Sequence, residues 1–111
     1  HDAEEAALLA ADVIVIEDGR ALQAGPREQV FGAPASGRVA RLLARSLYPA
    51  SVTDVIELGE SKQLSLRLDS GAELTTPVGA GHGFARGDRV LVSLDPAAIT
   101  VTRDPAADAG R

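Results

Sequence analysis

Few side chains in this 111-residue chain could act as a catalytic base. It has two histidines, His1 and His82, and no cysteine. Glu4 and Glu5 are adjacent, which is more typical of acidic residues at the start of a helix than of an acid–base pair. The serines are scattered, so no serine–histidine–aspartate triad can be assembled with confidence. The residues therefore give no support for an independent hydrolase.

His82 lies in the glycine-rich stretch Gly79-Ala80-Gly81-His82-Gly83, which predicts a loop. An imidazole in a loop can bind a metal, but no second ligand is spaced near it, so a solvated histidine is the simpler interpretation. The lack of cysteine excludes disulfides and thiolate metal sites, and it fits a reducing compartment.

The first half of the chain predicts short helices and one hairpin. Residues 3–11 form a candidate helix, with Asp2 as the N-cap. Val13–Ile16 is a run of four β-branched residues and predicts a buried strand. The turn signal Asp18-Gly19 then allows residues 20–24 to return as a second strand.

Two more helices are expected, from Pro26 to about Phe31 and from Ser36 to Ser46. The second is clearly amphipathic, because its large apolar residues fall on one face and its arginines on the other. The apolar residues are Val39, Leu42 and Leu43, and the arginines are Arg38, Arg41 and Arg45. A solvated helix face is the simplest interpretation of the arginines.

Pro49 marks a predicted boundary, beyond which the apolar period changes from helical to alternating. In the first strand of this half, both faces are expected to be partly buried. Five short strands separated by tight turns predict a small β-barrel. They are expected at 52–58, 64–68, 73–78, 89–94 and 99–103, and residues 104–111 are expected to be a disordered tail.

Composition excludes several classes of function. Apolar residues make up 45% of the chain, which is enough for a core, but aromatic residues make up only 3%. The net charge of −5 argues against a general nucleic-acid or anionic-membrane surface. Base-stacking aromatics are also scarce, so oligonucleotide binding by the barrel is discounted. No apolar run approaches the roughly 18 residues of a membrane-spanning helix.

The first forty residues resemble the end of the ATPase domain of ATP-binding-cassette (ABC) importers. An ordered series of short motifs carries the resemblance: His1-Asp2, Glu5-Ala6, Leu9-Ala10, Val13–Ile16, Gly19-Arg20, Gln23-x-Gly25, Phe31, Pro34 and Val39-Ala40. The family usually has aspartate and then a basic residue after Leu-Ala, whereas this chain has Ala11 and then Asp12.

The second half resembles the transport-associated OB-type domain that follows the ATPase in these subunits. The matching motifs are Leu58-Gly59, Asp69 with Gly71, Gly87-Asp88-Arg89-Val90, and Pro96 followed by Ile99 and Val101. The resemblance thus implies an α+β fold. Residues 1–48 would be the tail of an ATPase domain, with short helices and a β-hairpin, and 49–103 a five-stranded OB-like barrel.

The resemblance implies that His1 is the switch histidine, which contacts the γ-phosphate of ATP in the parent ATPase. ATP and Mg²⁺ would be cofactors of that parent protein. The sequence contains no G-x-x-x-x-G-K-[ST] phosphate loop and no acidic strand to hold Mg²⁺, so this segment by itself is expected to bind neither and not to be catalytic.

Related single-copy modules bind oxyanions such as molybdate, and the resemblance makes Ser61, Lys62 and Ser93 candidate ligands. A structural or dimer-forming barrel is the alternative for each of them. The expected partners are a second copy of the chain and the membrane permease subunits of an importer. The importer would take up an oxyanion, iron, sugar or similar solute, and the chain would be cytoplasmic and peripheral to the membrane. A free-standing oxyanion-binding module remains the alternative function.

Overall fold

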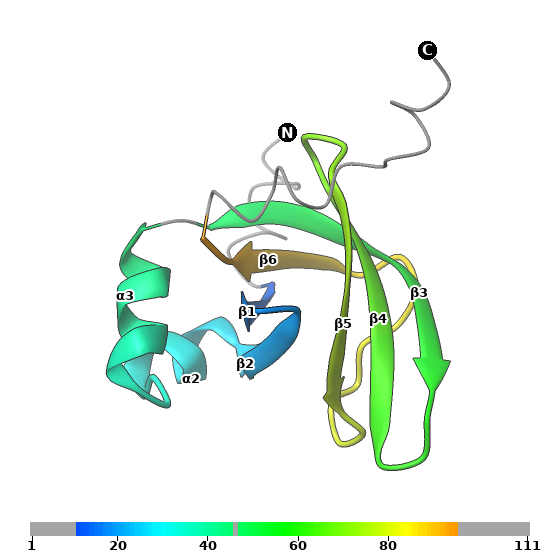
Figure 1. Ribbon diagram of the computed structural model, residues 1–111, viewed down its shortest axis with the longest axis horizontal. Coiled ribbons are helices and arrows are strands. Elements are labelled where there is room, and N and C mark those ends of the chain that lie inside the picture. Colours follow the sequence, from blue (N-terminus) through cyan, green and yellow to red (C-terminus); the bar gives the residue numbers. More distant parts are fainter. Residues whose placement is uncertain (1–10, 46, 96–111) are drawn as a thin grey trace.

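The computed structural model of the chain describes residues 11–45 and 47–95 (Figure 1). The predictions for His1, for almost all of the helix at 3–11, for the strand at 99–103 and for the tail at 104–111 lie outside these residues. Within them, the fold is mostly β, with two short helices. The elements are β1 (Asp12–Glu17), β2 (Arg20–Pro26), α2 (Arg27–Gly32), α3 (Gly37–Arg45), β3 (Tyr48–Glu57), β4 (Ser61–Leu68), β5 (Glu73–Gly79) and β6 (Arg89–Ser93).

The strands form one sheet in the order β2-β1-β6-β3-β4-β5. Among the strands of the described residues, only the β1–β6 pair is parallel, with Asp12 opposite Val90 and Val15 opposite Ser93. The sheet curls so that its two end strands, β2 and β5, contact each other without a hydrogen-bonded ladder between them. The result is a nearly closed barrel, with the helices on one side of it (Figure 1).

The prediction of a five-stranded barrel made only from residues after 48 was wrong. β1 and β2 belong to the same sheet as β3–β6, so the described sheet has six strands. The physical reason is that Val13–Ile16 is buried on both faces and needs a neighbouring strand along each edge, which β2 and β6 provide. The sheet itself continues across residue 48. The division of the chain there into the tail of an ATPase domain and an OB-type domain remains a prediction.

β1 separates two apolar clusters. Ile14 and Ile16 point into the barrel, where they join residues of every other strand, including Val52, Leu64 and Val92. Val13 and Val15 point to the opposite face, against the helices. This alternation explains why a continuous apolar run is stable at this position in the sheet.

The predicted amphipathic helix is confirmed as α3. Val39, Leu42 and Leu43 are buried against β1, while its three arginines are exposed. Ser36 begins the helix, since its hydroxyl oxygen accepts a hydrogen bond from the amide N–H of Val39 at 3.2 Å. Arg38 donates to the carboxylate of Glu17 at the end of β1, which raises the pKa of the arginine and fixes the helix to the sheet.

The predicted turns are also confirmed. Asp18 and Gly19 both have positive φ, of 53° and 74°, as a two-residue hairpin turn between β1 and β2 requires. Pro49, in contrast, does not separate two elements of secondary structure: it lies inside β3, which begins at Tyr48. Tyr48–Ser51 pair with β6, so the strand begins before the apolar alternation becomes visible in the sequence.

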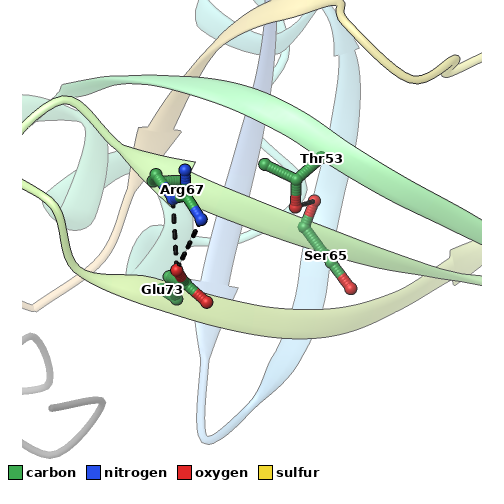
Figure 2. A network of polar contacts seen from close by, with 4 residues as sticks. All are labelled: Thr53, Ser65, Arg67 and Glu73. Atoms are coloured by element: carbon green, nitrogen blue, oxygen red, sulfur yellow. Dashed lines mark hydrogen bonds and ion pairs between the residues drawn. The ribbon is translucent and has the colours of Figure 1, made fainter. Parts of the chain in front are cut away.

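A β-bulge lies in the middle of β3. The register with β4 shifts between Val52 and Asp54, so Thr53 is an extra residue in the strand. Its hydroxyl donates to the main-chain oxygen of Ser65 at 3.1 Å, as Figure 2 shows. After the bulge, Val55 packs against the barrel interior, as Val52 does before it.

Candidate functional site

The structure does not bring the predicted oxyanion ligands together. Ser61 and Lys62 begin β4, at the level of Glu57 on β3. Ser93 ends β6, next to Val92, which is opposite Tyr48 at the other end of β3. The length of β3 therefore separates them, roughly 30 Å at about 3.3 Å per residue. Ser93 also lies opposite Val15, on the helix-covered face, so these residues do not form one site within a single chain.

Lys62 connects the β3–β4 hairpin to the loop between β5 and β6. Its Nζ donates to the main-chain oxygen of His82 at 2.7 Å and lies 3.8 Å from a carboxylate oxygen of Glu57. The lysine side chain is only 15% exposed. The imidazole of His82 in turn packs on Phe84, with ring centroids 5.8 Å apart. Lys62 therefore links the start of β4 to the loop that follows β5, and one of its three N–H donors has an acceptor at a short distance.

Ser93 is fully buried, and its hydroxyl is the one buried side-chain polar group in residues 11–45 and 47–95 that has no hydrogen-bond partner. A buried hydroxyl without a partner costs free energy. Its neighbours on this face of the sheet are apolar, including Val15 and Leu91. Nothing in these surroundings resembles an oxyanion-binding site.

A polar network that sequence reasoning missed lies where β6 begins. The Arg89 guanidinium donates to both carboxylate oxygens of Asp69, at 2.7 and 2.8 Å, and to the hydroxyl of Ser51 at 2.9 Å. The hydrogen bonds from Arg89 hold the pKa of Asp69 below its usual value. The sequence motifs contained both residues, Asp69 in the Asp/Gly turn and Arg89 in Gly-Asp-x-Val, but neither motif indicates that the two side chains pair. The network joins β3, the β4–β5 turn and β6.

The turn before β6 is also tightly held. A carboxylate oxygen of Asp88 accepts the amide N–H of Ala85 at 2.9 Å, and Gly87 has a φ of 94°, a conformation that favours glycine. The amide N–H of Gly87 donates to the main-chain oxygen of Val52, and the N–H of Val52 donates to the main-chain oxygen of Asp88. The Gly-Asp pair of the motif therefore fixes the start of β6 against β3.

Beside this turn is an open pocket of about 420 Å³. Its walls are Ala11, Asp12, Phe84, Gly87, Asp88, Arg89 and Val90. Asp12 and Asp88 meet there only because β1 pairs with β6, so no local pattern in the sequence could have predicted it. The carboxylates could accept hydrogen bonds from a donor. The pocket lies beside Ala11, the first residue that the structure describes.

The described parts of the chain contain no group of three or more histidine, cysteine, aspartate or glutamate side chains placed to hold a metal ion. His82 accordingly has no partner ligands among them. In the same residues, no helix is both long and apolar enough to cross a membrane. His1 lies outside them, so its predicted role remains a prediction.

The described fold is thus a nearly closed barrel with two short helices between its second and third strands. Residues 28–101 match the model of the TOBE domain family. Because that match covers well over half of the chain, the chain belongs to the TOBE domain family.

Two curated proteins are similar to the chain over most of its length. It is 36% identical over 97 residues to the spermidine/putrescine import ATP-binding protein PotA of Ruegeria pomeroyi. It is 32% identical over 98 residues to the protein of the same name from Oleidesulfovibrio alaskensis. Each alignment covers 86% of this chain but only 24% of the relative, so the chain spans about a quarter of the length of these proteins. No solved structure matches the chain significantly.

Proposed function

We propose that the chain is the C-terminal regulatory and dimerisation segment of the ATP-hydrolysing subunit of an ABC importer, and is not catalytic by itself. The observation that carries this proposal is the similarity to import ATP-binding proteins over 86% of the chain. The family match at residues 28–101 supports it. In this proposal His1 is the switch histidine of the parent ATPase, whose other segments bind ATP and Mg²⁺.

The partners follow from the same proposal. The parent subunit would act with membrane permease subunits, on the cytoplasmic side of the membrane and peripheral to it. The two relatives are both named for spermidine and putrescine import, which favours a polyamine as the transported solute over an oxyanion, iron or a sugar. The small size of the barrel favours a homodimer, because a domain of this size buries little apolar surface by itself.

Reading the coding sequence upstream of the His1 codon tests the proposal most simply. We expect one continuous reading frame that encodes a G-x-x-x-x-G-K-[ST] phosphate loop and, further on, an acidic strand for Mg²⁺. The parent protein should hydrolyse ATP, and His1→Ala should abolish that hydrolysis while nucleotide binding remains. A stop codon directly upstream of the His1 codon, or a frame without a phosphate loop, would contradict the proposal.

The geometry of Lys62 supports one alternative, a small oxyanion-binding module. The amine lies at the end of the barrel next to Ser61, with donors beyond the bond to His82. Calorimetric titration of the chain with molybdate, and with sulfate for comparison, tests it. Tight binding that is lost in Lys62→Met would favour this alternative, and no heat of binding with either anion would eliminate it.

A further inference from the structure

We draw no further inference here: the strongest candidate, the open pocket between the first residues of β1 and the turn before β6, rests on a pair of acidic side chains, Asp12 and Asp88, with no second observation in the described residues that points to a ligand.

Discussion

The two faces of β1 meet very different surroundings. On one face, Ile14 and Ile16 contribute to the barrel interior, which is closed by five other strands. On the other face, Val13 and Val15 are covered by two short helices, through Val30, Val39 and Leu42. The barrel interior is enclosed by hydrogen-bonded strands, whereas the helix-covered cluster depends on side-chain packing of helices too short to be stable alone.

This difference shows that the segment before residue 48 contributes to two structures at once. Its strands complete the barrel, and its helices cover the outside of those strands (Figure 1). β1 is the shared element, so a change on either of its faces is transmitted to the same strand. We therefore expect the two clusters to unfold as one unit.

Truncation of a core residue on each face tests this expectation and should have the largest effect. Ile14→Ala removes a fully buried side chain from the barrel, and Leu42→Ala removes one from the helix-covered cluster. Each should lower the free energy of unfolding by about 2–5 kcal/mol. Urea denaturation followed by circular dichroism should show a single transition in both variants. Two transitions in Leu42→Ala, with only one of them shifted, would show that the clusters are independent.

Gln23 tests how the helices are attached, with a smaller expected effect. Its side-chain amide donates to the oxygen of Ala33 at 3.1 Å, and its amide oxygen accepts the N–H of Ala35 at 2.7 Å. Gln23→Leu removes both bonds between β2 and the α2–α3 connection, which should cost about 1–2 kcal/mol in urea denaturation. Gln29→Leu, on the exposed side of α2, is the control. Equal stability of the two variants would show that the Gln23 bonds do not hold the helices.

Local patterns predicted much of this fold. The four-residue run Val13–Ile16, the Asp18-Gly19 turn, the amphipathic helix and the alternation of Leu64, Leu66 and Leu68 all correspond to elements of the structure. In each, the residues that define the element are neighbours in the sequence, so period and turn chemistry are sufficient. The resemblance to importer ATPase subunits is supported by the family match and the relatives.

The partners of β1 could not be predicted in this way. The pairing of β1 with β6 joins residues more than seventy positions apart, and nothing local to Val13 or Leu91 specifies it. The bulge at Thr53 has no sequence signal either, so the single strand predicted at 52–58 gave no indication that its side chains change face after Val52. Of the predicted ligands, Ser61 and Lys62 are neighbours, whereas Ser93 lies far from both because they are at opposite ends of β3.

Substitution of Asp69 tests its ion pair with Arg89, which joins the β4–β5 turn to β6. Because the pKa of Asp69 is lower in the folded than in the unfolded chain, the pair stabilises the fold above the ordinary aspartate pKa of about 4. That stability is lost as the pH falls through the folded-state value. Asp69→Asn should therefore reduce the melting temperature at pH 7 and weaken its fall below about pH 4.

The effect should be below about 1 kcal/mol, since the Asp69 side chain is 50% exposed and solvent screens the pair. Asp54→Asn is the control, because the carboxylate of Asp54 accepts a main-chain N–H and is not paired with an arginine in the same way. Identical pH profiles for the unaltered chain and Asp69→Asn would contradict the account of this pair.

The smallest expected effect has the opposite sign. Ser93→Ala removes the buried hydroxyl that has no hydrogen-bond partner, on the helix-covered face of β6. The free energy of unfolding should stay the same or rise by up to about 1 kcal/mol in urea denaturation. If the free energy of unfolding fell by more than about 1 kcal/mol, the hydroxyl would have a role in the fold, and Ser93 would again be a candidate ligand.

Native-state hydrogen exchange tests most directly whether the chain is one sheet. The amides of Val13–Ile16 in β1 and of Leu64–Leu68 in β4 should exchange with the same free energy of opening, equal to that of global unfolding, and should respond equally to low concentrations of urea. If the amides of β1 exchanged through a much smaller opening that is insensitive to urea, while those of β4 stayed protected, the segment before residue 48 would be an appendage rather than part of the barrel.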